Sequence, residues 1–354
     1  MQKPPLQLSH PGLDDPDGSK ELDEQLVSLC KTLTAAAGLY DPPPEATEPA
    51  QNQLPMWPVG VRGGPNAILR SALFAGIHSK KRATIGEYVK PEKPLQAVTL
   101  AAQEGVVVKF AGRQLNQYDA DVFFETLHRA RLHPLETECL FTGYSLLKGI
   151  GRPTSEQAYE DLDDSLTRLR DGRVEIHWES QGIPLKFVGG LISEYSRGEG
   201  PTDKLFKVKL ASAVKTLFRS SCWTQIEWEE RQALRGHPLA SWLHSYYSTH
   251  ANPLPVKCAF LHEKTGSKRP TVRNFRTDLK AALKTLHDVL GWDWELDPKT
   301  DLVTVRRQPS RAQARHLDRK RQRRRPLTAG KGRARARDGA GATQLRLGED
   351  LAPA

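Results

Sequence analysis

Apolar residues recur with helical spacing through two separate stretches of the chain, and each stretch ends in strand-like runs. In the first stretch the spacing predicts helices from Ala120, over 145–150 and over 154–171. Three β-like runs follow, at 174–178, 185–195 and 205–210. Three helices followed by a hairpin are the element order of a winged-helix domain.

The second stretch repeats this order. Its helical runs lie at 228–234, 239–250, 256–264 and 270–290. Trp292, Trp294 and Leu296 then alternate, and after a turn Val303 and Val305 return as a second strand. We therefore predict an α+β fold with tandem winged-helix domains, in which each of two helical cores carries a β-hairpin.

A chain of 354 residues is long enough for two such domains, which we place at 54–210 and 211–308. Residues 1–53 are acidic and rich in proline, so they are predicted to be disordered. Within them, Leu22, Leu26, Leu29 and Leu33 share one face of a possible short helix.

Basic residues dominate after Arg307. Residues 309–354 are predicted to form a disordered, Arg-rich tail, because like charges repel one another. Such a tail adds affinity for phosphates without reading base sequence. The alternative is a solvated tail with no specific partner.

The run at 270–290 carries the strongest functional pattern. Its apolar stripe lies beside a basic one, and Pro270 suits the start of a helix. The geometry is typical of a helix that packs on its domain and places a basic edge in a DNA major groove. We expect base contacts from Arg273, Asn274 and Arg276 and phosphate contacts from Lys280, Lys284 and Arg307. The remaining basic candidates are Arg269 and Arg306.

An ordinary amphipathic helix with solvated lysines and arginines is the alternative for this run. The corresponding helix of the first domain is acidic, with Glu156, Glu160 and Asp161 among its carboxylates. Phosphate contacts in that domain are therefore expected from Lys148, Arg152 or Arg168, or from its hairpin.

The formal net charge of +10 favours a polyanionic partner. No phosphate-binding loop, no His-x-His pair and no close cysteine spacing is present, so we expect no enzyme activity, no cofactor and no metal site. The four cysteines are expected to be buried thiols. No run of ~20 apolar residues occurs, so a cytoplasmic protein without a membrane segment is expected.

Several blocks of residues follow one another in the order of a known family. They include Trp57-Pro58-x-x-x-Arg62-x-x-Pro65-Asn66, Phe141-Thr142-x-Tyr144-Ser145-Leu146-Leu147-Lys148 and Leu239-Ala240-x-Trp242-Leu243-His244-x-Tyr246-Tyr247. With these blocks, roughly residues 54–306 resemble the TrfA family of plasmid replication initiators.

The resemblance implies a DNA-binding protein that binds direct repeats, called iterons, in double-stranded origin DNA and opens the adjacent AT-rich DNA. It also implies a role in plasmid copy control, contacts with the host initiator, the replicative helicase and the sliding clamp, and an inactive homodimer. For the clamp, Ser71-Ala72-Leu73-Phe74 ends in the Leu-Phe pair of clamp-binding peptides. The alternative is that Leu73 and Phe74 are core residues.

Two other functions remain open on the sequence. One is a winged-helix transcriptional repressor that binds a promoter without opening DNA. The other is a nuclease or relaxase, for which the sequence offers no metal-binding histidine pair.

Overall fold

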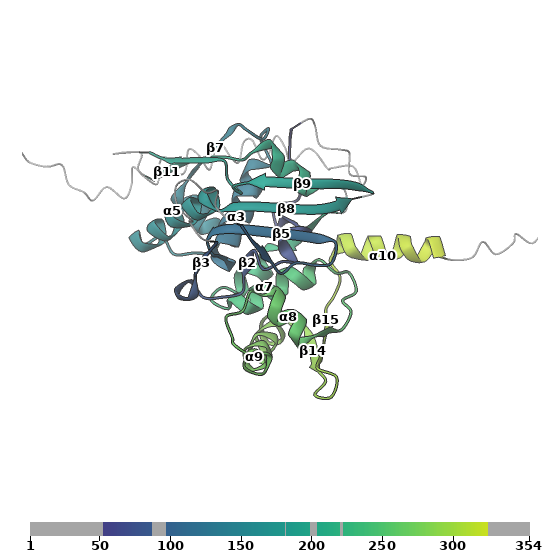
Figure 1. Ribbon diagram of the computed structural model, residues 1–354. Coiled ribbons are helices and arrows are strands. Elements are labelled where there is room, and N and C mark those ends of the chain that lie inside the picture. Colours follow the sequence, from purple (N-terminus) through teal and green to yellow (C-terminus); the bar gives the residue numbers. More distant parts are fainter. Residues whose placement is uncertain (1–51, 87–96, 181, 199–203, 220–221, 325–354) are drawn as a thin grey trace, which may run out of the picture. The chain divides into compact units, whose positions relative to one another are not determined.

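The computed structural model describes residues 52–86, 97–180, 182–198, 204–219 and 222–324. They divide after Gln308 into two units. The larger unit combines helices with strands (Figure 1), which confirms the predicted α+β class. Residues 1–51 of the predicted disordered extension 1–53, with the leucine-lined helix, lie outside the described part. Its last two residues are ordered, since the Asn52 and Gln53 side chains donate to the carbonyl oxygens of Leu135 and Arg131.

Two hydrophobic cores lie within the larger unit. The first contains residues from Leu54 to Trp228, and the second contains residues from Leu234 to Val305. The cores therefore separate between Trp228 and Leu234, later in the chain than the predicted boundary at residue 210. Val214 and Phe218, which sequence analysis placed in the second domain, are buried in the first core.

The first core is built on a helix, a strand, two helices and a hairpin. In chain order these are α3 (Gln117–Ala130), β7 (Glu138–Thr142), α4 (Gly143–Gly149), α5 (Glu156–Asp171), β10 (Glu194–Arg197) and β11 (Leu205–Lys209). Strand β11 lies between β10 and β7 and is antiparallel to both. Strand β7, which precedes α4 and α5, thus forms a three-stranded sheet with the β10–β11 hairpin that follows these helices.

The second core repeats this arrangement after the short helix α6 (Trp228–Ala233). Its elements are α7 (Pro238–Ser248), β13 (Val256–Lys257), α8 (Cys258–Lys264), α9 (Val272–Leu290), β14 (Asp293–Leu296) and β15 (Leu302–Arg306). Strand β15 lies between β13 and β14, again with antiparallel pairing. In Figure 1, α9 lies with β14 and β15 at one end of the larger unit, and β7 lies with β11 at the other end.

A separate five-stranded sheet corrects the predicted hairpin of the first domain. Its strands are β3 (Thr84–Ile85), β4 (Val98–Leu100), β5 (Val106–Arg113), β8 (Arg173–Ser180) and β9 (Ile183–Gly189). The order is β3-β5-β8-β9, and β4 also pairs with β5. The runs at 174–178 and 185–189 therefore pair with each other and with β5, and only β10 and β11 form the hairpin next to β7.

The segment before α3 ties the two ends of the first core together. It contains β1 (Val61–Pro65), α2 (Asn66–Leu69), β2 (Phe74–Ala75), η1 (Ser79–Lys81) and β6 (Leu115–Asn116). The last elements of the first core are η3 (Ser212–Phe218) and β12 (Trp223–Glu227). Strand β1 pairs with β12 over five residues, and β2 pairs in parallel with β6. The first core therefore closes immediately before the second begins.

A buried arginine joins the two cores. Arg231 is 2% exposed and donates hydrogen bonds to the Asp121 carboxylate (2.7 Å) and the Gln117 carbonyl oxygen (3.2 Å), both on α3. It also donates to the Ser241 carbonyl and the Ser245 hydroxyl on α7. Burial raises the pKa of the Asp121 carboxyl, and the Arg231 guanidinium opposes that shift. One side chain thus holds α3 against α6 and α7.

The smaller unit corrects the prediction of a wholly disordered tail. Residues Arg311–Arg324 form helix α10. Ser310 and Gln313 cap its start, because the Gln313 amide donates to the Ser310 hydroxyl and the Ser310 amide donates to the Gln313 side chain. Arginine, alanine and glutamine are good helix formers, which outweighs the charge repulsion. Residues 325–354 lie outside the described part.

Replacement of Arg231 is expected to destabilise the protein. Arg231→Ala leaves the Asp121 carboxylate without its buried partner, so the free energy of unfolding should fall by about 3–5 kcal/mol. Urea denaturation measures this loss. Arg235→Ala, at an exposed position just after α6, is the control, and an equal loss in both variants would contradict a special role for Arg231.

A buried histidine predicts a pH dependence of stability. Trp57 Nε1 donates to His128 Nδ1 (2.9 Å), and burial together with Arg62 and Arg131 lowers the pKa of His128 to about 2. In the unfolded chain His128 takes up a proton near the ordinary histidine pKa of ~6.5. Its contribution to the free energy of unfolding should therefore be fully present above that pH and should be lost progressively as the pH falls below it.

Between pH 7 and pH 5 this histidine should cost about 2 kcal/mol of unfolding free energy. His128→Gln retains an acceptor for Trp57 but does not titrate, so its urea-denaturation midpoint should vary less over that interval. Identical pH dependence of the two proteins would refute this assignment.

Candidate nucleic-acid interface

Helix α9 has one side in the second core and the other in solvent. Phe275, Leu279, Ala282, Leu283 and Leu286 are buried, as the apolar stripe predicts. The helix begins two residues after Pro270, because the Thr271 hydroxyl accepts a hydrogen bond from the Asn274 amide and so caps the first turn. Gly291 ends it in the left-handed conformation with φ 68°.

The basic stripe lies on the exposed side of α9, as expected. Arg273, Asn274, Lys280 and Lys284 are exposed, and Arg276 is half-buried. Arg269 is exposed just before the helix. The structure thus brings the six candidate residues of this segment to one helix and its N-terminal loop.

Acidic residues pair with three of these cations. Arg269 binds Asp278 (2.5 Å), Arg276 binds Asp301 (2.6 Å) and Lys284 binds Asp288 (2.7 Å). Pairs that are this exposed contribute little to stability, so a phosphate or a base can replace the carboxylate. The sequence did not reveal the Arg276–Asp301 pair, which joins α9 to the start of strand β15.

Two cations of α9 have no such competitor. Arg273 and Lys280 form no ion pair with any residue in the described part of the chain, and no described residue hydrogen-bonds to the Asn274 side chain. At ~100° per residue, Arg273 and Lys280 lie about 20° apart around the helix axis. They are the α9 side chains most available to an anionic ligand.

The two arginines after the hairpin differ in their surroundings. Arg306 is exposed and pairs with Glu295 at 3.2 Å. Arg307 donates to the carbonyl oxygens of Tyr247 (3.0 Å), Ser248 (3.3 Å) and His250 (2.9 Å). These bonds cap the C-terminal end of α7. The structure therefore corrects the expectation that Arg307 holds phosphates, since its guanidinium has a structural role.

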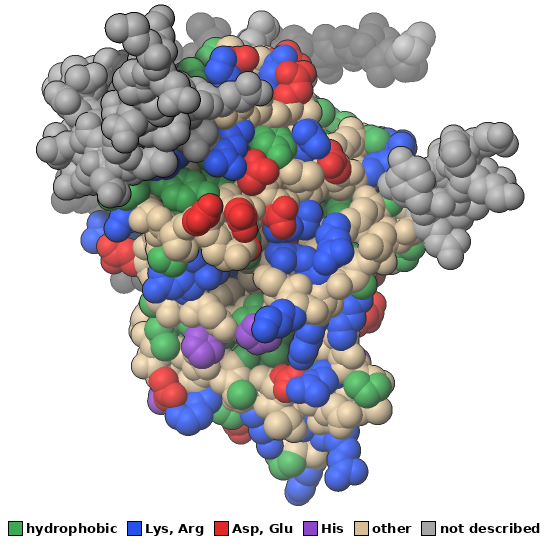
Figure 2. All heavy atoms as spheres, turned by 90° about the vertical axis from the view of Figure 1, so that its left-hand side faces the viewer, with side chains coloured by type: hydrophobic (Ala, Val, Ile, Leu, Met, Phe, Trp, Pro, Cys, Tyr) green, Lys and Arg blue, Asp and Glu red, His purple; other side chains and the backbone are tan. Residues whose placement is uncertain are grey.

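The first-domain candidates lie on and after α4. Lys148 is exposed, with its Nζ 5.6 Å from the Tyr144 ring centre. Arg152 is half-buried over the Tyr118 ring at 5.0 Å. Neighbouring α5 presents exposed acidic residues, namely Glu156, Glu160, Asp161 and Asp164. On the side of Figure 1 where α5 and α9 are drawn, Figure 2 shows Lys and Arg side chains gathered below a row of Asp and Glu.

The proposed clamp-binding pair is part of the first core. Leu73 is 1% exposed and Phe74 is 3% exposed. The Phe74 ring packs against Phe123 and Phe124 with centroids 5.9 and 6.0 Å apart. The prediction that these two side chains fill a pocket on a clamp is therefore wrong, and core packing explains them.

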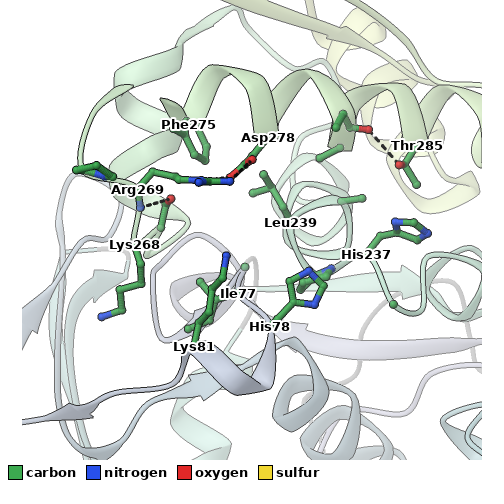
Figure 3. A pocket seen from close by; sticks show the side chains of 18 residues that line it. Ile77, His78, Lys81, His237, Leu239, Lys268, Arg269, Phe275, Asp278 and Thr285 are labelled. Atoms are coloured by element: carbon green, nitrogen blue, oxygen red, sulfur yellow. Dashed lines mark hydrogen bonds and ion pairs between the residues drawn. The ribbon is translucent and has the colours of Figure 1, made fainter. Parts of the chain in front are cut away.

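A cleft between the two cores was missed in the sequence. It has a volume of about 430 Å³ and lies between the segment 76–81 of the first core and α7 and α9 of the second (Figure 3). The short basic run His78-Ser79-Lys80-Lys81-Arg82 was a signal for it. Lys268, which lines the other side of the cleft, is adjacent in sequence to the candidate Arg269.

The described residues hold no group of three or more His, Cys, Asp or Glu side chains placed to bind a metal ion. Cys139 and Cys258 are buried, as expected, and Cys222 is half-buried. Among the helices that the structure describes, none has the length and apolar character needed to cross a membrane.

Comparison with known proteins matches most of the chain to one family. The family model described as TrfA protein matches residues 50–306. The chain belongs to the TrfA family. The plasmid replication initiator protein TrfA of Escherichia coli is 23% identical in an alignment of 321 residues that covers 81% of each chain.

The TrfA-family match ends at the last residue of β15, so α10 lies beyond it. Two crystal structures of domains 2 and 3 of RctB are also similar, with TM-scores of 0.44 and 0.40 and identities of 13% and 14%. Each similarity covers 63% of this chain, and 95% and 93% of the RctB chains.

The contrast between Arg306 and Arg307 predicts different effects on stability. Arg307→Ala removes charged donors from three carbonyl oxygens, so the unfolding free energy should fall by about 1.5–3 kcal/mol. Arg306→Ala should change it by less than ~0.5 kcal/mol, because its ion pair is exposed. Urea denaturation compares the two, and equal values would show that Arg307 does not cap α7.

Proposed function

We propose that this protein is a plasmid replication initiator that binds direct repeats in origin DNA through two winged-helix domains. The observation that carries the proposal is the exposed basic face of α9, on which Arg273 and Lys280 have no acidic partner in the described residues. The E. coli relative is described as a plasmid replication initiator, and family membership supports the same role here.

The element order supports two winged helices. In each core a helix, a strand, two helices and a hairpin follow in turn, and the strand pairs with the second strand of the hairpin. In helix-turn-helix proteins the second helix of the turn enters the major groove. That position is occupied by α9 in the second core and by α5 in the first.

The side chains of α9 divide by chemistry. Arg273 and Arg276 suit guanine and Asn274 suits adenine, because each can form two hydrogen bonds to one base edge. Lys280, Lys284, Arg269 and Arg306 suit phosphates. Arg276 contacts DNA only when it leaves Asp301. The acidic α5 does not fit a groove, so Lys148 and Arg152 give the first domain phosphate contacts.

The protein would then act without catalysing a reaction. The free energy of DNA binding deforms the DNA and promotes opening of the adjacent AT-rich sequence. Contacts with the host initiator, the replicative helicase and the sliding clamp, and an inactive homodimer, are proposed from the family resemblance. The protein acts on plasmid DNA in the bacterial cytoplasm. Helix α10 and the residues after it add affinity for phosphates irrespective of base sequence.

Footprinting on the plasmid that encodes the protein tests this function. The wild type should protect evenly spaced direct repeats at a stated salt concentration, because affinity depends steeply on salt. Arg273→Ala should weaken binding to the repeats by about 1–3 kcal/mol and relax base preference at one position. The control Lys186→Ala, on the outer face of the five-stranded sheet, should bind as the wild type does.

Equal losses of Arg273→Ala on repeat and random DNA would contradict base reading by α9. Permanganate reactivity of thymines beside the repeats separates an initiator from a repressor, which binds but does not open DNA. Nicking of supercoiled origin DNA would instead indicate a nuclease.

A further inference from the structure

The cleft between the two cores is lined by both of them. Ile77, His78 and Lys81 lie between β2 and β3, in the stretch of chain that builds the first core, and Leu239 and Lys268 lie in the stretch that builds the second. In Figure 3, His78 and Lys81 extend from the first-core side toward α9, which forms the opposite wall. The cleft therefore exists only when the two cores are packed together.

The charged lining residues are mainly cations. Lys81 and Lys268 are exposed, and neither forms an ion pair with a described residue. His78 and His237 add exposed imidazole rings. Asp278 is the one acidic residue among the described lining residues, and Arg269 already binds it. A neighbouring hollow of about 150 Å³ shares His78 and adds Arg152, Arg235 and Asp121, and Arg231 binds this carboxylate. Positive charge thus extends from α9 across the cleft to the end of α4.

The cleft and the basic stripe lie on different sides of α9. Phe275, Asp278 and Thr285 face the cleft. At ~100° per residue, Lys280 lies about 160° around the axis from Asp278, on the side where Arg276 meets the hairpin. The exposed face of α9 therefore has the hairpin along one edge and the cleft along the other.

A duplex with α9 in its major groove presents one phosphate backbone on each side of the helix. The hairpin side would meet one backbone, and the cleft would meet the other. The first turn of α7 faces the cleft as well, where no described side chain caps it. Its backbone N–H groups add to the positive potential of the lysines.

We propose that the inter-core cleft binds a phosphodiester group of the DNA backbone, held mainly by Lys81 of the first core and Lys268 of the second. This inference rests on the proposed function and assigns a second contact to it. The first domain thereby takes part in binding without inserting its acidic α5. A single phosphate bridges the two cores, so DNA affinity depends on how the cores are packed.

Lys81→Ala and Lys268→Ala test the cleft, with Lys186→Ala as the control of equal charge. Binding of the full chain to origin and to random-sequence duplexes is measured from 0.05 to 0.3 M salt. Each cleft variant should make the dependence of log affinity on log salt concentration less steep, by up to about 0.9, which is the value for one phosphate, and should lower affinity near 0.15 M by roughly fivefold. Both duplexes should be affected alike, since a phosphate contact carries no base information.

Ethylation interference locates the contact. The backbone phosphates of both strands are ethylated one at a time. Ethylation of the phosphate that lies in the cleft should weaken DNA binding by the wild type, and it should weaken binding by Lys81→Ala less. If both cleft variants match Lys186→Ala in slope and affinity while Arg273→Ala still loses binding, the cleft inference is wrong and the proposed function stands. If the wild type does not prefer origin DNA, the proposed function itself fails.

Discussion

The buried contact of Arg231 with Asp121 is the constraint on which the arrangement of the molecule depends. The Arg231 guanidinium has bonds to both α3 and α7, so neither helix can move without leaving a buried charge unpaired. Trp242 reinforces the junction, since its Nε1 donates to the Ser71 carbonyl at 3.1 Å. Because α7 also contacts α9, the junction fixes where the basic helix lies relative to the first core.

The second core could be predicted from sequence nearly element by element, whereas the first could not. From Trp228 to Val305 the elements are amphipathic helices and one short hairpin, whose signals are local. In the first core β7 pairs with β11, and β5 pairs with β8, across long stretches of chain. Sequence analysis predicted no strand before residue 174, so it missed β5 and β7. Without these partners, β8 and β9 were assigned to the hairpin.

The site shows the same limit. The positions of Arg273, Asn274 and Lys280 follow from helical periodicity, so their exposure was predictable. Periodicity says nothing about residues that the fold brings in from elsewhere. Asp301 reaches Arg276 from the hairpin, and the α7 carbonyl groups reach Arg307 from an earlier helix. Lys81 joins Lys268 in one cleft only because the two cores pack together.

The carboxylates beside α9 bear on specificity. An arginine that is held by an aspartate gains less from a phosphate than an unpaired one, because the aspartate must then be solvated alone. A guanine edge returns two directed hydrogen bonds to the same guanidinium, so Arg276 favours a matching base over a phosphate met at random. Cations without an acidic partner among the described residues, such as Arg273 and Lys280, attract any duplex. Pairing part of the basic face thus lowers affinity for non-specific DNA more than affinity for the correct sequence.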